Sequence, residues 1–334
     1  MLDTLYHQAT RQFEAARSLP QKGSRHGHSF VISARSATLA RAPLENALSA
    51  YTQNLDYRDL DPLFTVADDI SLLAQCAQTL NAPADLHLHA GPQRGAARQA
   101  DGTFYHWQRW QFEAAHQLPH VPAGHQCGRL HGHTFEVRLY ADASLSSQAA
   151  LSAAWVPCYA ALHQQYLNAL PGLENPTSER LAGWLWQRLV PTLPGLAAVV
   201  VFETQSAGCQ FDGQDYRIWK TQHFESAVPL DVQGRYSGHS YQVRLHLCGP
   251  LDPYLGWTLD YSDVKTLFKP LYEALDHHAI DTLPGIEATD CASITAWIST
   301  RLAAIMPALE RVDIFNRAQD GAIRVLRGQP ALAI

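Results

Sequence analysis

The feature that most limits the possible folds of this chain is an internal repeat. A short motif occurs three times, as FEAARSLP (13–20), FEAAHQLP (112–119) and FESAVPL (224–230). A second motif follows each copy, as SRHGHSFVISAR (24–35), GRLHGHTFEVRLY (128–140) and GRYSGHSYQVRLHL (234–247). Such internal repeats indicate copies of one structural unit that pack side by side.

Each repeat predicts the same order of elements. The alternation of apolar and polar residues in FEVRLY and YQVRLHL is typical of strands, so the two motifs predict an antiparallel pair. Helices are expected at 181–190 and 294–303, and short apolar strands at 197–204 and 311–316. The hydroxyls of PTSE are expected to cap the former helix. Each unit therefore is predicted as β-β-α-α-β-β over about 100–110 residues, the size of one domain.

The predicted units cover residues 1–108, 109–221 and 222–334. The first is the most degenerate copy, and its segment 91–102, GPQRGAARQADG, is expected to be an exposed loop. Its role beyond completing the assembly is left open.

Composition excludes several classes of protein. With 46% hydrophobic and 17% charged residues, the chain predicts a substantial core, and its net charge of −6 argues against a general nucleic-acid binder. The N-terminus lacks the pattern of a signal peptide, and no apolar run approaches the ~18 residues that cross a membrane. Six scattered cysteines without a CxxC pair favour free thiols in a reducing cytoplasm.

The second unit differs from the others in its histidines. The aligned positions hold His116, His131 and His133 in the second unit, Arg17, His26 and His28 in the first, and Val228, Ser237 and His239 in the third. Residues two apart on a strand face the same side, and the paired strand can bring the remaining histidine to that face. Three imidazoles with an open fourth position describe a catalytic zinc site. The alternative for an isolated HxH segment is a pair of ordinary histidines.

A cysteine precedes the HGH segment by four residues. Cys127 lies in the polar loop GHQCGR, next to Arg129 and near the predicted cation, and both are expected to favour the reactive thiolate. Ligation of zinc by Cys127 is the alternative role. A buried, apolar role is expected for the other cysteines considered, Cys76, Cys158, Cys248 and Cys291.

FEAAH, followed by CGRLHGHTFEV and FET, resembles the 6-pyruvoyltetrahydropterin synthase family. The C-x-x-x-H-G-H spacing is similar to that of its 6-carboxytetrahydropterin synthase branch, which serves queuosine and 7-deazaguanine synthesis. The resemblance covers the second and third units well and the first weakly. It implies an α+β architecture, the T-fold, in which ββααββ units assemble into a barrel with helices outside. Members form trimers stacked into hexamers, with active sites between subunits.

The resemblance also implies roles for residues. The zinc ligands would be His116, His131 and His133, the catalytic cysteine Cys127, and the pterin-anchoring carboxylate Glu203, whose third-unit equivalent is Asn316. An acid–base pair from a neighbouring subunit corresponds to Asp276 and His277 of the third unit, whereas the second unit has His163 and Gln164 there. We therefore expect one site divided between fused units, a pseudo-trimer in one chain, and a homodimer as pseudo-hexamer.

The implied reaction converts 7,8-dihydroneopterin triphosphate to 6-carboxy-5,6,7,8-tetrahydropterin, acetaldehyde and triphosphate. Zinc would lower the pKa of the substrate hydroxyls, and Cys127 and His277 would move protons. Arg129, Arg25 and Arg235 are candidates for the triphosphate. Alternatives are a pyruvoyl-forming synthase or related pterin lyase, a non-catalytic zinc- or pterin-binding scaffold, and a metal-dependent hydrolase. The hydrolase would need Glu136 as its base, which strand alternation places on the opposite face from His133.

Overall fold

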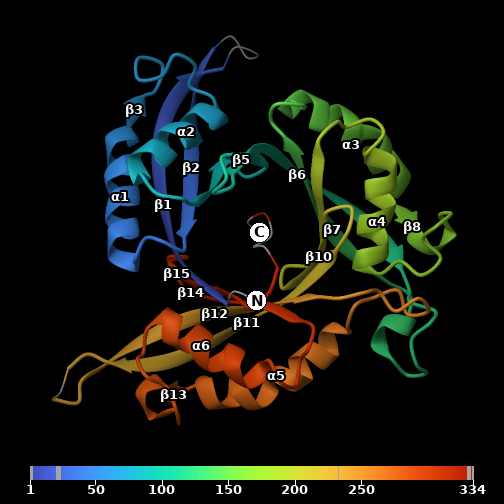
Figure 1. Cartoon of the computed structure of the whole chain (residues 1–334). Coiled ribbons are helices and arrows are strands. Elements are labelled where there is room, and N and C mark those ends of the chain that lie inside the picture. The colour runs from blue at the N-terminus through green and yellow to red at the C-terminus, as the bar shows by residue number, and fades with distance from the viewer. Residues whose placement is uncertain (1–2, 20–23, 232, 329–331, 333–334) are drawn as a thin grey trace.

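The three repeats close into one barrel with helices on its outer side (Figure 1). The structure, a computed structural model, describes residues 3–19, 24–231, 233–328 and 332. Its sheet has 15 strands, and the pairing of β10 with β11 closes the part of the strand path that runs from β10 to β11 into a ring. The strands β3, β8 and β13, each of two residues, pair outside this ring. The predicted α+β barrel is therefore confirmed.

All three units follow the predicted order of elements. The first contains β1 (Thr4–Ser18), β2 (Arg25–Ser36), α1 (Arg41–Leu55), β3 (Arg58–Asp59), α2 (Asp69–Leu80), β4 (Asp85–Ala90) and β5 (Arg94–Arg98). The second contains β6 (Phe104–His116), β7 (His131–Asp142), α3 (Gln148–Leu162), β8 (Gln165–Tyr166), α4 (Ser178–Leu189), β9 (Leu196–Thr204) and β10 (Ala207–Phe211). The third contains β11 (Tyr216–Pro229), β12 (Tyr236–Cys248), α5 (Tyr261–Leu275), β13 (His278–Ala279), α6 (Cys291–Leu302), β14 (Leu309–Asn316) and β15 (Gly321–Val325). The short 3-10 turns are η1 (Gln126–Gly128), η2 (Leu167–Ala169) and η3 (Ile280–Thr282).

The long hairpin of each unit has the same register. Arg17 lies opposite His26, His116 opposite His131, and Val228 opposite Ser237. The sequence alignment of the three units therefore matches positions that are equivalent in space.

The two faces of the sheet are buried against different partners. On β7, Phe135, Val137 and Leu139 pack with the helices in the main apolar core. The alternate residue Tyr140 belongs to a second cluster on the opposite, lumen-facing side, together with Trp107, Val200, Trp219 and Leu332. The middle of β7 is therefore buried on both faces of the sheet.

The expectation of an exposed loop at 91–102 is wrong. Residues Arg94–Arg98 form β5, a strand of the barrel, and its central residues Gly95, Ala96 and Ala97 are buried or nearly so. A side chain at Gly95 would meet the backbone oxygen of Leu88 at 1.8 Å and the ring of Trp107 at 2.8 Å. Small residues are thus required by close packing, and their low hydrophobicity hides the strand in the sequence.

The units are joined without a linker. The predicted boundaries after residues 108 and 221 fall inside the long strands β6 and β11. Among the described residues, no helix is long and apolar enough to cross a membrane.

Candidate active site

The three second-unit histidines meet at the end of the β6–β7 hairpin. His116 and His131 are cross-strand partners, and their ring centroids lie 4.5 Å apart. The ring of His133 lies 5.1 Å from that of His116 and 5.0 Å from that of His131. One ligand atom from each histidine, together with a carboxylate oxygen of Glu203, lie within 4.8 Å of one another.

Backbone carbonyl groups determine which ring nitrogen carries the proton in two of the histidines. Nδ1 of His116 lies 3.1 Å from the carbonyl oxygen of Pro176, and Nδ1 of His131 lies 2.7 Å from that of Arg129. A carbonyl only accepts, so each Nδ1 carries the proton and each Nε2 keeps a free lone pair. Nε2 of His116 is buried and has no hydrogen-bond partner among the described residues. Burial lowers the pKa of His116, which keeps the ring in its neutral, metal-binding form.

This arrangement fits zinc. Zinc prefers imidazole nitrogens in a tetrahedral set, and catalytic sites use three protein ligands and leave the fourth position for water or substrate. The orphaned Nε2 of His116 has no other function in the described structure. His116, His131 and His133 could therefore hold the ion together.

Glu203 lies at the end of β9 beside the histidines. Its Oε1 is 3.3 Å from Nε2 of His133, and its Oε2 accepts a hydrogen bond of 2.6 Å from the hydroxyl of Ser178. Burial alone would raise the pKa of Glu203, but its contact with His133 and its hydrogen bond from Ser178 outweigh burial and lower that pKa. Glu203 is therefore an ionised acceptor that lies between the histidines and the start of α4.

Cys127 lies in η1 and lines the same cavity as His131, His133 and Glu203. Its pKa is raised, first by burial and then by the charges of Glu203 and Asp260. The expectation that Arg129 favours the thiolate is not met in the metal-free chain, because Arg129 is exposed and the charged neighbours that act on the thiol are acidic. The thiolate therefore needs a further cation, such as a metal ion, in this cavity.

The remaining cysteines are free thiols. Cys76, Cys158 and Cys291 are buried as expected, and so is Cys209. Cys248 is partly exposed, which differs from its predicted burial because it is the last residue of β12.

The cavity has a volume of about 740 Å³ and is formed by two units. The β6–β7 loop, β7 and the β9–β10 hairpin form one wall, and β11 and the start of α5 form the other. The lining residues are His125, Gln126, Cys127, Arg129, Leu130, His131, His133, Glu203, Thr204, Ala207, Lys220, Asp260, Tyr261, Ser262 and Lys265. A smaller, more enclosed recess adjoins it, lined by Leu118, Cys127, Thr177, Ser178, Glu179, Glu203, Trp257, Leu259, Asp260 and Tyr261.

The structure does not bring Asp276 and His277 into this cavity within one chain. Nδ1 of His277 lies 2.9 Å from Oδ2 of Asp276, and Oδ1 of Asp276 accepts from the backbone N–H of Glu225. The side chain of His277 is 78% exposed and lines a separate depression of about 510 Å³, with His239 and His278 among its walls. Asp276 and His277 thus contact each other, but the depression that His277 lines shares no residue with the cavity of the histidine cluster.

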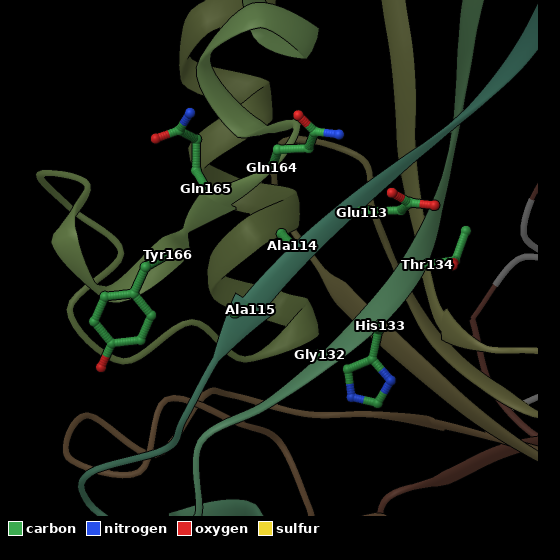
Figure 2. A pocket seen from close by; sticks show the side chains of 9 residues that line it. All are labelled: Glu113, Ala114, Ala115, Gly132, His133, Thr134, Gln164, Gln165 and Tyr166. Atoms are coloured by element: carbon green, nitrogen blue, oxygen red, sulfur yellow. The ribbon is translucent and has the colours of Figure 1, made fainter.

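Figure 2 shows the second-unit counterpart of that depression. Gln164 stands where the third unit has His277, and both have positive φ, 59° in each case. β8 pairs with the edge of β6 opposite β7, so β6 separates Gln164 and Gln165 from His133. Because the second unit has His163 and Gln164 at the positions of Asp276 and His277, it has no Asp-His pair here.

Several residues of the cavity were not identified from the sequence. His125 before η1, Lys220 in β11, and Asp260 and Lys265 at the start of α5 all line it. Glu179, in the smaller recess, accepts from the backbone N–H of Thr258 at 3.0 Å, and burial raises its pKa to about 7. For Glu179, the sequence signal was the segment PTSE (176–179), which predicted the start of a helix. Thr177 caps α4 as predicted, and Glu179 lies in the first turn of that helix.

Glu136 does not serve as a base for the histidine cluster. Its oxygens lie 3.1 Å from Arg109 and 3.4 Å from Arg138 on the lumen side of the sheet. The hydrolase alternative therefore lacks the carboxylate that it requires.

Comparisons with known proteins identify the family of this chain. A family model described as 6-pyruvoyl tetrahydropterin synthase matches residues 106–214 and again 217–325. The 6-carboxy-5,6,7,8-tetrahydropterin synthase of Synechocystis sp. is 34% identical, over 31% of this chain and 90% of that protein.

Solved structures with similar folds include two 6-pyruvoyl tetrahydropterin synthases. The Caenorhabditis elegans protein has 17% identity and a TM-score of 0.30, over 34% of this chain and 96% of that chain. The Plasmodium vivax protein has 17% identity and a TM-score of 0.28, over 33% of this chain and 98% of that chain. The two tandem matches to the family model cover more than half of the sequence. The chain therefore belongs to the 6-pyruvoyl tetrahydropterin synthase family and is a lyase of that family.

Proposed function

We propose that this chain converts 7,8-dihydroneopterin triphosphate and water to 6-carboxy-5,6,7,8-tetrahydropterin, acetaldehyde and triphosphate, in the cytoplasmic synthesis of queuosine and related 7-deazaguanines. The observation that carries the proposal is the gathering of three histidines, Cys127 and Glu203 around one cavity. The 34% identity to a cyanobacterial protein of that name supports the same reaction.

Zinc is the proposed cofactor, held by His116, His131 and His133. When bound, it would supply Lewis-acid chemistry that lowers the pKa of the substrate's hydroxyls and, by its charge, the pKa of Cys127. The backbone carbonyls of Pro176 and Arg129 keep two of the rings in the required tautomer.

Cys127 is the proposed proton-transfer group, because it is the titratable thiol at the mouth of both recesses. Glu203 is the proposed pterin anchor. As an ionised carboxylate it can accept two N–H groups from the planar pterin edge, while Trp257 and Leu118 provide apolar walls for the ring.

The triphosphate is assigned to the cations of the larger cavity. Arg129, Lys220 and Lys265 line it, and burial lowers the pKa of Lys220, with Lys265 adding to the effect. The other two candidates lie elsewhere, since Arg25 is 3.0 Å from Asp59 and Arg235 pairs with Asp231. Cations grouped in one partly enclosed cavity suit a polyanionic substrate.

Asp276 and His277 are proposed to act in a homodimer. Because His277 lines a depression separate from the Cys127 cavity of its own chain, a second copy would have to present the pair to that cavity. Two stacked barrels would then form the pseudo-hexamer, with two working sites.

The test is to incubate the zinc-loaded chain with 7,8-dihydroneopterin triphosphate and identify the products by mass spectrometry. Carboxytetrahydropterin with acetaldehyde is expected. Formation of pyruvoyltetrahydropterin would agree with the proposed site but contradict the proposed product. No turnover by a chain that binds zinc would contradict the proposed reaction and favour a binding scaffold.

A further inference from the structure

The third unit reaches the Cys127 cavity through the segment that precedes α5, at residues 252–260. This segment lies against the loop and the helix start of the second unit. Its contacts are Asn175 Nδ2 to Leu255 O (2.6 Å), Thr177 Oγ1 to Gly256 O (2.7 Å) and Thr258 N to Glu179 Oε1 (3.0 Å). It ends at Asp260, which lines both recesses.

Asp260 joins the two units at the catalytic loop. Its Oδ2 lies 3.0 Å from Nε2 of His125, and the two side chains are only 17% and 22% exposed. Nδ1 of His125 in turn accepts a hydrogen bond of 3.2 Å from the backbone N–H of Cys127. A carboxylate of the third unit is thus linked through one imidazole to the residue that carries the thiol.

The hydrogen bonds fix the state of His125. Because the N–H of Cys127 donates to Nδ1, the ring proton must lie on Nε2, where Asp260 accepts it. Oδ1 of Asp260 is engaged separately, since it accepts from the backbone N–H and the hydroxyl of Ser262 at the start of α5. Hydrogen bonds therefore connect the start of helix α5 to Asp260, Asp260 to the ring of His125, and that ring to the backbone of Cys127.

We propose that His125 and Asp260 are positioning residues that fix Cys127 in the cavity across the boundary between the second and third units. The inference rests on the proposed function in that Cys127 acts on the substrate. The third unit completes the site of its own chain through Asp260, and this contribution is separate from that of Asp276 and His277.

Two substitutions remove the hydrogen bond between His125 and Asp260 while they keep the neighbouring backbone contacts. His125→Asn keeps an acceptor for the N–H two residues ahead, as asparagine does in an Asx turn, but is too short to reach Asp260. Asp260→Ser keeps a good N-cap for α5 and also loses the link. We expect each substitution to lower kcat about tenfold and to leave KM within about twofold of the wild-type value. The double variant should have a kcat no lower than that of the less active single variant, because both substitutions break the same link.

Activities are compared per bound zinc at each variant's pH plateau, because Asp260 also raises the pKa of Cys127. The matched control is His120→Ala. His120 stacks on Tyr254 of the third unit with ring centroids 4.4 Å apart, so its loss removes a contact of the same loop that does not lead to Cys127. We expect the control to keep kcat within about twofold. Wild-type kcat in His125→Asn, multiplied losses in the double variant, or an equal loss in the control would overturn the proposal.

A second measurement needs no substrate. Hydrogen exchange of a peptide spanning residues 122–130 should be faster in His125→Asn and in Asp260→Ser than in the wild-type chain. Unchanged exchange in both variants would contradict the link. If the wild-type chain fails to turn over the pterin, the proposed function fails while the exchange result still decides this inference.

Discussion

The first and second units place different chemistry at the same point of the same hairpin. In the second unit, the buried Nε2 of His116 has no hydrogen-bond partner in the described part of the chain and lies beside two further imidazoles. In the first unit, Arg17 takes that position, and its guanidinium lies 2.6 Å from Asp69 and 4.9 Å from the ring centre of Phe30. In the first unit, the ion pair of Arg17 and Asp69 thus occupies the place where the second unit offers histidine ligands for a metal.

The third unit shows another solution. Val228 is buried at the equivalent position and packs in the main apolar core. The three units therefore share one backbone and differ in how the hairpin end is filled: by an ion pair, by open imidazoles, or by an apolar side chain. The comparison teaches that the fold forms without the full set of three histidines, so we expect the complete set in the second unit to serve function.

The largest expected effect follows from breaking the histidine cluster. His131→Ala removes one of three ligands, so zinc binding should be lost and turnover should fall at least about 10³-fold, equivalent to about 4 kcal/mol. Metal analysis and product formation measure it. The control is His26→Ala, the equivalent change in the first unit, which should leave both quantities unchanged. Loss of zinc in the control would contradict the assignment of the site to the second unit.

Cys127→Ala should lower turnover by about 10²–10⁴-fold, the range for losing a proton-transfer group, while zinc stays bound. Cys248→Ala, at a partly exposed cysteine of the third unit, is the control. If the Cys127 variant loses zinc as well, then the thiol is a ligand of the metal.

Removing the cation of the first unit should affect stability instead of activity. Arg17→Ala leaves Asp69 buried without its main partner, which should lower the free energy of unfolding by about 3–5 kcal/mol. Urea denaturation of the metal-free chain measures this, with His116→Ala as the comparison in the second unit. A larger loss in His116→Ala would contradict the view that only the first unit depends on its built-in charge.

The smallest expected effect is the pH dependence contributed by Glu179. Its pKa is about 7, raised from 4.5 by burial, so the folded chain binds more protons than the unfolded chain between those values. The stability of the metal-free chain should therefore fall as pH rises from about 4.5 to 7, by about 3 kcal/mol, and stay level above that. Glu179→Gln should remove this slope in urea denaturation. An unchanged slope would show that Glu179 is solvated. Helix alignment places Ile70 and Ala292 at this position in the other units, so the effect belongs to the second unit alone.

The hairpins and the histidine face could be predicted from the sequence because both depend on local periodicity. Strand alternation fixed the shared face of His131 and His133, and the repeat placed His116 opposite. β5 was missed because its buried centre is glycine and alanine, which give no apolar signal.

Contacts between units could not be predicted in the same way. His125 and Asp260 are 135 residues apart, and only the closed barrel brings them together. The position of Asp276 and His277 was likewise decided by the barrel, because the short strand β13 holds them beside β11, away from the second-unit cavity. Spacing along the chain carries no information about either contact.

The central claim is that one chain has one metal site, built by the second unit. The most direct test is calorimetric titration of the metal-depleted chain with zinc, repeated with His116→Ala. The account predicts about one zinc per wild-type chain and no comparable binding by the variant. Two or three equivalent sites per chain, or a single site that survives the substitution, would contradict it.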